Sequence, residues 1–328
     1  MPLIDELRKA IAPEMREGVP LAPFTTFRIG GPAEYYFEAK TDEEAVRAIA
    51  ACRDLGLPYH VLGGGSNLLV SDDGIRGLTI RMVNSSVSVD GPVVTAGAGT
   101  PSGRLARETA EAGLSGLEWM IGLPGTVGGA IRGNAGMFGS EVKDSLESVS
   151  VLTPGGEARI MENRDCLFGY RDSAFKRLPG TVILSAKFRL TIGEAEACRK
   201  KMRGFLEKKT TAQPVSGLTA GCAFKNWLPK NEGEIVIVRE GLGLAPEEAV
   251  PRTPTGAVPT GWIIDRAQLK GMRIGGGFVS EKHGNFIVND GTGTASDVIA
   301  LTAAVRMRVR DMTHGIILLE DEIEYVGF

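Results

Sequence analysis

Short apolar runs bounded by glycine, proline and polar turn residues predict strands along most of the chain. They are expected at Ala33–Lys40, Tyr59–Leu62, Asn67–Val70, Leu78–Met82, Val93–Gly97, Ser145–Thr153, Glu157–Met161, Thr181–Thr191 and Ile316–Val326. Apolar positions at helical spacing predict helices at 41–56, 100–113, 194–209, 262–268 and 294–315. Because the strands of the middle part read as antiparallel and few helices separate them, the pattern favours an α+β fold over a doubly wound sheet.

Capping residues set the expected helix ends. Thr41 and Thr294 each precede an acidic residue by three positions, which is the spacing of a capping box. Thr100 is expected to cap a helix that has Pro101 at its first position and that ends at Gly113.

Changes in pattern along the chain predict its domains. The first 67 residues form a β-α-β-glycine-loop unit, which predicts a small α/β subdomain at 1–67. A second subdomain is expected at 68–213, because the segment TTAQP ends a polar helix at Pro214. A third domain is expected at 214–315, with the strand at 316–328 returning to the first. The stretch Leu228–Pro259 is rich in Pro, Glu and Gly and is interpreted as an excursion.

Charge and composition exclude several classes of protein. The 328 residues include 37 Lys and Arg against 40 Asp and Glu, a balance that argues against a nucleic-acid or membrane-surface binder. Asp5, Glu6 and Arg8 interrupt any apolar run at the start, and no later run approaches a membrane span. Four cysteines and three histidines are scattered, so no metal site is expected. A cytoplasmic protein fits best.

Glycine is the compositional outlier, with 44 of the 328 residues. Many lie in two segments, Gly63–Asn67 (the first glycine loop) and Gly122–Gly139 (the second glycine loop). Backbone N–H groups in such loops can hold a diphosphate without an excess of positive charge. Neither loop has the Rossmann or P-loop spacing. The alternative is that both are tight turns in a glycine-rich scaffold.

Seven motifs occur in the order found in the UDP-N-acetylenolpyruvoylglucosamine reductase (MurB) family, which the chain resembles from about Leu21 to Gly327. They are TTFRIGG, LGGGSNLLVSD with the second glycine loop, GYRDSAF, GCAFKN, LKGMRIGG, VSEKHGNFIVN and LEDEIEYVG. The resemblance implies a two-subdomain FAD-binding fold of the vanillyl-alcohol oxidase type followed by a C-terminal α/β substrate-binding domain. VSEKHGNFIVN resembles the family's shorter subtype.

The resemblance also implies the reaction. NADPH reduces bound FAD, and hydride then passes to C3 of the enolpyruvyl ether of UDP-N-acetylglucosamine, giving UDP-N-acetylmuramate for peptidoglycan. The expected partner is this UDP-sugar, with no nucleic acid, no membrane and no obligate protein partner, so a monomer is expected. The expected FAD-binding residues are Leu62, Gly63, Gly64, Gly65, Ser66, Asn67, Leu123, Pro124, Gly125, Thr126, Gly128, Gly129, Asn134 and Gly136.

Hydride addition at C3 builds negative charge on C2 and on the adjoining carboxylate, so the site needs a cation and an acid. Family correspondence gives the first role to Arg171, whose alternative is a salt bridge. It gives the acid to Cys222, where the commoner pattern has serine; the alternative is a small buried apolar residue. Glu322 corresponds to the catalytic glutamate, but Glu320 and Glu324 share its strand parity, and an acidic solvent-facing strand is the alternative.

Four further residues lie in matched substrate motifs. Tyr170, Lys225, Asn226 and His283 are expected to contact the nucleotide diphosphate or the sugar, although a lone histidine such as His283 is otherwise a satisfied structural residue. Two other functions stay open from the sequence. One is an FAD oxidoreductase of the same fold that acts on another sugar or hydroxy acid, and the other is a nucleotide-binding regulatory protein without turnover.

Overall fold

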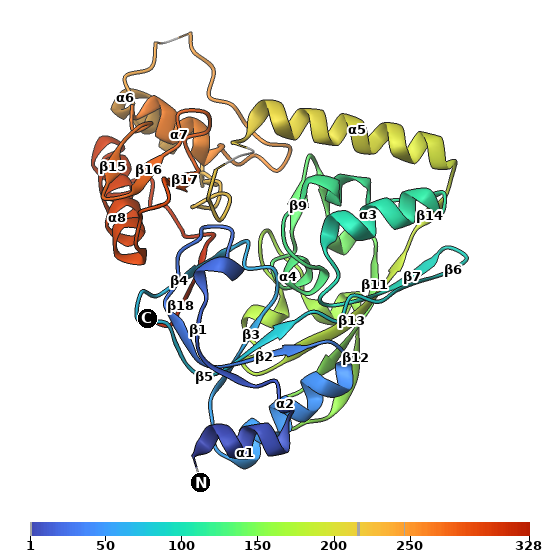
Figure 1. The fold of residues 1–328 in the computed structure, drawn as a ribbon. Helices are drawn as coiled ribbons and strands as arrows, with labels where there is room; N and C mark the ends of the chain where they lie inside the picture. Colours follow the sequence, from blue (N-terminus) through green and yellow to red (C-terminus); the bar gives the residue numbers. More distant parts are fainter. Residues whose placement is uncertain (1, 215–216, 246) are drawn as a thin grey trace. The chain divides into compact units, whose positions relative to one another are not determined.

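The computed structural model describes residues 2–214, 217–245 and 247–328 (Figure 1). Contacts between Cα atoms divide the chain into two units, which are described separately. The first unit consists of the segments up to Pro20, Pro32–Gly65 and Ile75–Thr211, and the second of Leu21–Gly31, Ser66–Gly74 and the chain from Ala212 onward. The mixed content of helices and antiparallel strands confirms the expected α+β class.

The first unit contains a four-stranded sheet with the order β1-β2-β5-β3 (Arg16–Pro20, Pro32–Ala39, Ile75–Met82, Tyr59–Leu62). β2 and β3 both run parallel to β5. Helices α1 (Leu3–Ala10) and α2 (Asp42–Asp54) share a buried cluster with this sheet. The Thr41 hydroxyl accepts a hydrogen bond from the Glu44 backbone N–H, as predicted, whereas the Glu44 carboxylate caps Lys40 and not Thr41.

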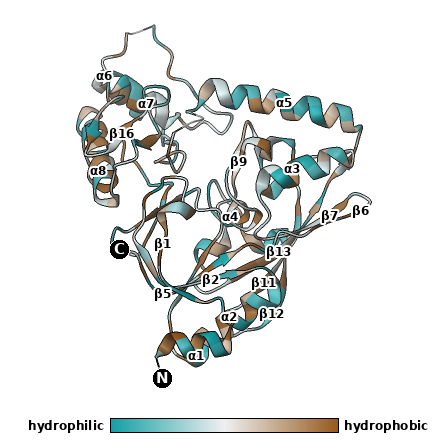
Figure 2. Cartoon of the chain, viewed as in Figure 1, coloured by the Kyte–Doolittle hydropathy of each residue, from teal (hydrophilic) through white to brown (hydrophobic). Residues whose placement is uncertain are grey.

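A second, antiparallel sheet of the same unit has the order β12-β11-β13-β7-β6 (Ala158–Glu162, Leu146–Leu152, Val182–Arg189, Val93–Gly97, Val87–Asp90). Three helices belong to this part, α3 (Ser102–Glu111), α4 (Val127–Arg132) and α5 (Ala195–Ala212). Two short strand pairs complete it, β8 with β14 (Leu114–Ser115, Thr191–Ile192) and β9 with β10 (Gly136–Met137, Ser140–Glu141). Figure 2 shows that α5 is largely hydrophilic, and Cys198 is its one fully buried residue.

The α-helices in the described part of the second unit are α6 (Glu232–Gly241), α7 (Thr260–Arg266) and α8 (Ala295–Met312). Its strands are β15 (Arg273–Ile274), β16 (Gly277–Val279) and β17 (Ile287–Asn289) in one sheet, and β4 (Leu68–Val70) parallel to β18 (Glu324–Val326) in another. The predicted capping box at Thr294 is confirmed. So is the predicted apolar face of α8, whose members Val298, Leu301, Val305 and Val309 are all fully buried.

Two predictions about elements are wrong, and the excursion contains a helix that was not predicted. Pro101, not Thr100, is the N-cap of α3, because Pro101 forms a β-bridge to Thr126 and so stays extended. The excursion contains α6, whose N-cap Asn231 accepts a hydrogen bond from the Glu234 backbone N–H. The expected strand Ile316–Val326 is a strand only at β18, because the residues before it are held by separate bridges to the segment around Phe224.

Neither a membrane span nor a metal cluster is seen in the part of the chain that the structure describes. No helix there is long and apolar enough to cross a membrane. No group of three or more His, Cys, Asp or Glu side chains there is placed to hold a metal ion.

Candidate functional site

The two glycine loops of the sequence lie against each other in the first unit. A Cβ atom added to Gly64 would be 2.5 Å from the Cα atom of Gly125, and one added to Gly63 would be 2.7 Å from the Oγ1 atom of Thr126. Both contacts are shorter than real Cβ atoms tolerate, so only glycine allows these backbones to approach so closely. Segments about 60 positions apart therefore form one backbone surface with few side chains.

Secondary structure fixes the second glycine loop on both sides. The Gly125 carbonyl accepts a hydrogen bond from the Ser102 N–H at the start of α3 (3.0 Å). Gly128, in the first turn of α4, donates to the Ala98 carbonyl (2.8 Å) and has its Cα so near Ala98 that a Cβ would be 3.0 Å from the Ala98 side chain. Gly125 itself has φ +98°, a left-handed conformation that favours glycine.

Buried hydroxyl groups at this loop test whether it suits a cofactor. The Oγ1 atom of Thr126 and the Oγ atom of Ser102 are buried, and neither has a hydrogen-bond partner among the residues described. A buried polar group without a partner is costly unless a ligand supplies one. The glycine surface and the two hydroxyls therefore fit a polar, diphosphate-containing group such as FAD.

The other expected FAD-binding residues have different surroundings. Leu62 is fully buried at the end of β3, and Leu123 and Pro124 lead from a short 3-10 turn into Gly125. Gly129 lies in α4. Gly65 ends the first-unit part of the first glycine loop with φ +58°, and Ser66 and Asn67 belong to the second unit.

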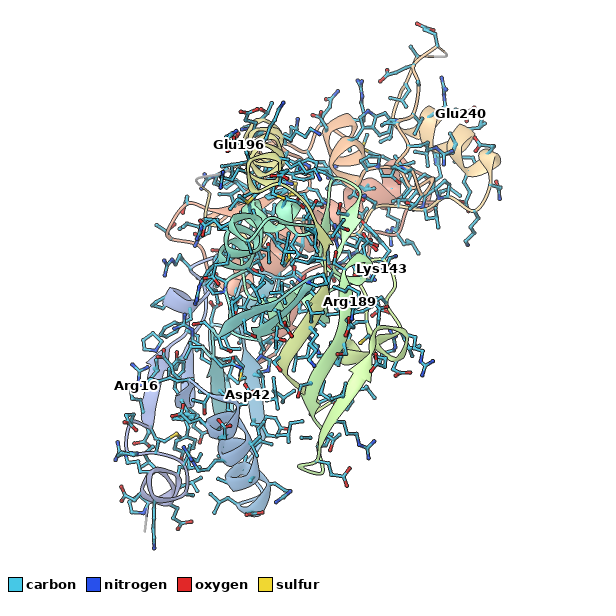
Figure 3. The ribbon with its side chains drawn as sticks, turned by 90° about the vertical axis from the view of Figure 1, so that its right-hand side faces the viewer. Arg16, Asp42, Lys143, Arg189, Glu196 and Glu240 are labelled. Carbon is cyan, nitrogen blue, oxygen red and sulfur yellow. The ribbon has the colours of Figure 1, made fainter. Side chains whose placement is uncertain are left out.

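Asn134 is fully buried and bonded to the protein. Its amide nitrogen donates to the Gly169 carbonyl (2.8 Å) and to the Glu141 carboxylate (3.1 Å), and its amide oxygen accepts from the Lys143 N–H (3.2 Å). The Lys143 ammonium, labelled in Figure 3, lies 2.7 Å from the same carboxylate of Glu141. These bonds favour a role in bracing the loop that carries Arg171 over direct contact with a cofactor.

Arg171 occupies a strained backbone position. It is the third residue of the turn Gly169–Asp172, whose ends exchange backbone hydrogen bonds of 2.9 and 3.3 Å. Its φ is +54°. Left-handed φ is uncommon for a residue with a long side chain. The guanidinium donates to the Gly136 carbonyl (2.7 Å) and lies 5.2 Å from the Tyr170 ring centre, and Tyr170 is largely exposed. Such strain marks a functional segment more often than a structural one.

In the second unit, Asn285 holds the segment that carries Cys222. Its side chain accepts from the Phe224 N–H (3.0 Å) and donates to the Phe224 carbonyl (2.7 Å), while its own carbonyl accepts from the Ala223 N–H (2.7 Å). Cys222 forms no disulfide bond, is partly buried and forms a β-bridge to Phe286. The thiol is therefore not the fully buried apolar group of the alternative interpretation, whereas Cys52, Cys166 and Cys198 are buried.

Glu322 lies beside this segment. Its backbone N–H donates to the Ala223 carbonyl (2.9 Å), and its carbonyl accepts from the amide of Asn67 (2.9 Å). The Asn67 carbonyl in turn accepts from the Glu324 N–H. The second unit thus brings Cys222 and Glu322 to neighbouring positions and ties Asn67 of the first glycine loop to the same place.

The remaining substrate candidates gather near the start of α7. The Thr260 hydroxyl donates to the Lys225 carbonyl (2.6 Å), and the Thr260 N–H donates to the Asn226 side chain (3.1 Å). The Lys225 ammonium lies 3.4 Å from the Glu320 carboxylate. Glu320 is therefore paired with one of the expected substrate-binding residues.

His283 packs closely against α7. A Cβ on Gly261 would be 2.7 Å from the His283 ring. The ring accepts a hydrogen bond from the Asn285 N–H (3.3 Å), and burial lowers the pKa of this histidine, with a smaller effect from the nearby Lys270 ammonium. A neutral ring that supports Asn285 favours the structural alternative for His283.

The structure places the expected site residues in both units of the chain. Cys222, Lys225, Asn226, His283 and Glu322 all belong to one region of the second unit, and Arg171 belongs to the first. Ser102 and Asn285 were not predicted. Asn285 lies inside a recognised motif, and Ser102 follows Pro101 at a predicted helix start, so a capping-type hydroxyl was the available signal.

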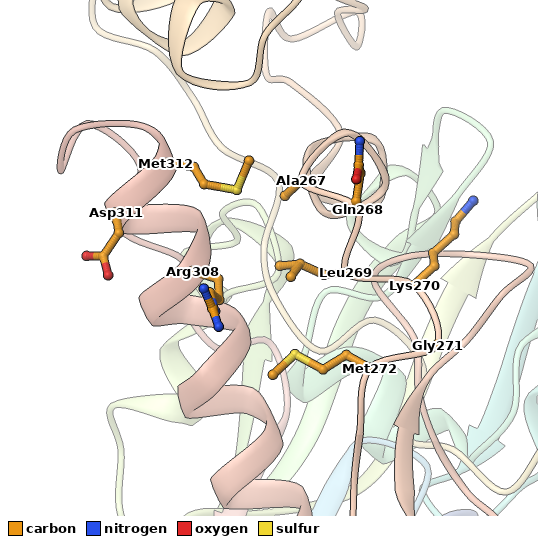
Figure 4. Close-up of a pocket in the computed structure, with 9 residues that line it drawn as sticks. All are labelled: Ala267, Gln268, Leu269, Lys270, Gly271, Met272, Arg308, Asp311 and Met312. Carbon is orange, nitrogen blue, oxygen red and sulfur yellow. The ribbon is translucent and has the colours of Figure 1, made fainter.

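A separate pocket of about 550 Å³ lies between the loop after α7 and the end of α8. Figure 4 shows that the Lys270 and Asp311 side chains point away from it in opposite directions, with Leu269, Met272 and Met312 between them. None of the predicted site residues lines this pocket. Because Lys270 and Asp311 diverge, these two groups do not converge on a ligand in this pocket.

Comparisons with known proteins give one consistent result. The family model described as "FAD binding domain" matches residues 33–162, and "UDP-N-acetylenolpyruvoylglucosamine reductase, C-terminal domain" matches residues 213–326. The UDP-N-acetylenolpyruvoylglucosamine reductases of Solibacter usitatus and Halalkalibacterium halodurans are 37% and 34% identical to the chain, covering 94% and 99% of it and 95% and 98% of their own lengths. The crystal structure of the Thermus caldophilus enzyme superposes with a TM-score of 0.75 at 35% identity, covering 95% of this chain and 99% of that one.

Proposed function

Since this chain belongs to the family of UDP-N-acetylenolpyruvoylglucosamine reductases, we propose that Arg171, Cys222 and Glu322 carry its reaction. The chain is an FAD-dependent oxidoreductase of peptidoglycan precursor synthesis that uses NADPH to reduce the enolpyruvyl ether of UDP-N-acetylglucosamine to UDP-N-acetylmuramate. Its substrate is therefore a UDP-sugar. Family membership decides against the two other functions that the sequence left open.

The meeting of the two glycine loops is the observation that supports the FAD site. Gly63, Gly64, Gly125 and Thr126 would bind the diphosphate through backbone N–H groups and the Thr126 hydroxyl. FAD bound there would supply the hydride chemistry that links NADPH to C3 of the substrate. Of the other expected FAD-binding residues, Asn134 is proposed to act through the Arg171 loop instead, because its amide is bonded there.

Arg171 would bind the carboxylate of the enolpyruvyl group. A guanidinium matches the two oxygens of a carboxylate and stabilises the charge that develops when hydride arrives at C3. The bond from Arg171 to the Gly136 carbonyl uses one of the five N–H donors and fixes the orientation of the group. Strain at Arg171 is consistent with a side chain held ready for the substrate.

Cys222 would deliver the proton to C2. A cysteine thiol has an ordinary pKa of roughly 8.5, so at neutral pH it is largely protonated while being more acidic than a serine hydroxyl. The proton leaves sulfur as the C2–H bond forms, and solvent restores it. Glu322, held one residue from Cys222 across the Ala223 contact, would hydrogen-bond the developing enolate or assist this proton transfer.

Several further statements belong to the proposal. We propose a division into FAD-binding parts at 1–67 and 68–213 and a substrate-binding domain at 214–315. We also propose that Tyr170, Lys225 and Asn226 contact the substrate nucleotide or sugar, that the protein is a monomer without an obligate partner, and that it works in the cytoplasm.

Anaerobic stopped-flow absorbance of the flavin tests the residue roles. NADPH should bleach the yellow enzyme, and the enolpyruvyl substrate should restore the colour. Arg171→Ala should slow the second step by about 100-fold or more, as removal of a transition-state charge partner does, while leaving the FAD content unchanged. An equal loss of bound FAD and of turnover would make Arg171 a structural residue instead.

A further inference from the structure

Helix α5 carries none of the recognised motifs, yet it contacts both segments that matter for the reaction within the first unit. Figure 1 shows it in yellow, and its last turns hold Phe205 and Lys209. Phe205 stacks on Phe138, with ring centres 5.9 Å apart and an angle of 21° between the rings. The Lys209 ammonium donates to the carbonyl of Gly122, the first residue of the second glycine loop.

Phe138 occupies a turn that does not suit it. Met137 pairs with Ser140, so Phe138 and Gly139 form the two-residue loop of the β9–β10 hairpin, with φ of +56° and +89°. Positive φ at both positions is typical of a type I′ turn, which favours Asn or Gly at the first of them. A bulky residue there is a genuine outlier. The contact that the ring makes with Phe205 offers the reason for its presence.

The hairpin links this ring to Arg171. The Gly136 carbonyl, two residues before Phe138, accepts the 2.7 Å hydrogen bond from the Arg171 guanidinium. Gly136 also pairs with Glu141 across the hairpin and has no room for a Cβ, which would be 2.6 Å from the Ser140 carbonyl oxygen. A shift of the hairpin is therefore transmitted directly to the acceptor that orients Arg171.

Lys209 links the same helix to Gly122, at the start of the second glycine loop. Its side chain is half-buried, and a Cβ on Gly122 would be 2.9 Å from its Cδ atom. Within the described residues no carboxylate pairs with Lys209, and burial lowers its pKa. The Met137 side chain of the hairpin also approaches Gly122, at 3.6 Å from the position of such a Cβ. The first residue of the second glycine loop and the hairpin at the end of this loop thus both contact the last turns of α5.

We propose that α5 fixes the position of Arg171 relative to the start of the second glycine loop, with Phe138 and Phe205 as positioning residues. This inference rests on the proposed role of Arg171. The Phe138 and Phe205 rings are not proposed to contact the reacting atoms of the substrate or the flavin. They determine the position of the hairpin and therefore of the Gly136 carbonyl. Displacement of a catalytic group by about 1 Å can lower a rate by about 100-fold, so a small movement of the hairpin is enough to be measured.

Phe138→Asn is the decisive variant because asparagine suits the left-handed turn while removing the ring. We expect the FAD content and the rate of NADPH bleaching to stay near those of the unmodified holoenzyme, and the melting temperature to stay the same or rise, because the strain at this turn is relieved. Reoxidation by the enolpyruvyl substrate should slow by about tenfold or more. Phe205→Ala should repeat this result, whereas Leu206→Ala, at an exposed position next to it on α5, should not. Normal reoxidation in Phe138→Asn would overturn the proposal.

A double-mutant cycle separates this role from general damage. Once Arg171→Ala has removed the guanidinium, Phe138→Asn should slow reoxidation no further, because nothing is left to position. An equally large loss in that background would overturn the proposal.

Chemical modification gives a readout that does not depend on turnover. Phenylglyoxal should modify Arg171 faster in the Phe138→Asn holoenzyme, as followed by peptide mass spectrometry, and an unchanged rate would overturn the positioning role. If modification is faster but Arg171→Ala reoxidises normally, the proposed role of Arg171 fails while the positioning by α5 stands.

Discussion

Gly64 is the position where one added methyl group tests the cofactor site most directly. Its φ lies outside the left-handed region, so alanine adds no backbone strain there, and the whole effect comes from contact. The new Cβ would lie 2.5 Å from the Gly125 Cα, 3.0 Å from the Gly125 carbonyl carbon and 3.3 Å from the Thr126 nitrogen. All three are backbone atoms, which cannot rotate away as a side chain does.

The expected size of the effect follows from these distances. Carbon atoms pack comfortably at about 3.5–4.0 Å, so the two loops must separate by about 1 Å to admit the methyl group. Overpacking of this kind costs about 1–3 kcal/mol. Since 1.4 kcal/mol corresponds to a tenfold change in an equilibrium constant, Gly64→Ala should raise the Kd for FAD by about 5- to 150-fold.

Titration of the apoprotein with FAD, followed by quenching of flavin fluorescence, measures this Kd. Gly204→Ala is the matched control, because it adds the same methyl group within α5 where no atom lies within 4 Å of it. Alanine is favoured over glycine in a helix by about 1 kcal/mol, so this control should keep its Kd and melt slightly higher. If Gly64→Ala bound FAD as tightly as the unmodified protein, the contact between the loops would not form the cofactor site.

Three further predictions concern the second unit. Asn285→Ala leaves the Phe224 N–H and carbonyl without their side-chain partner. The free energy of unfolding, measured in urea, should therefore fall by about 2–4 kcal/mol. Turnover should also fall at temperatures where the variant is still folded. Burial lowers the pKa of His283, so the unfolded chain binds a proton first as the pH falls below about 6.5, and the stability of the fold should decrease from there down to the lowered pKa. His283→Asn should weaken this pH dependence in melting scans between about pH 5 and 7.5. An unchanged slope of melting temperature against pH would contradict the prediction. Cys222→Ser should keep measurable turnover and remove inactivation by peroxide, whereas peroxide sensitivity that persists would locate the reactive thiol elsewhere.

The sequence predicts this fold best where one local pattern decides the outcome. The apolar face and capping box of α8 were predicted because both depend on residues within one helix. β3 and β7 were predicted to the residue for the same reason. α6 was missed because its stretch is rich in Pro, Glu and Gly, although Asn231 supplied a capping signal. The C-terminal strand was predicted too long because tertiary bridges, not a ladder, hold its first half.

The sequence allowed candidate site residues to be proposed, but it did not indicate which residues hold them in place. Glycine density indicated two close backbone approaches, and the structure shows that the two loops approach each other. The bonds of Asn285 and Asn134 join positions 35 to 61 residues apart, and no local pattern signals which partners they choose. The stack of Phe138 on Phe205 is equally distant in sequence and belongs to no motif.

Backbone strain in the first unit is concentrated around Arg171. Among the described residues of this unit, the non-glycine residues with left-handed φ are Asn134, Phe138, Leu167 and Arg171, and all of them lie in the segments that carry or contact the Arg171 loop. Each such conformation costs about 1–3 kcal/mol and persists only where surrounding contacts impose it. Here those contacts are the Asn134 amide bonds, the Phe138 stack and the Gly136 bond to Arg171. Relief of the strain should therefore stabilise the fold while loosening the guanidinium, so stability and the rate of substrate reduction should change in opposite directions at these positions.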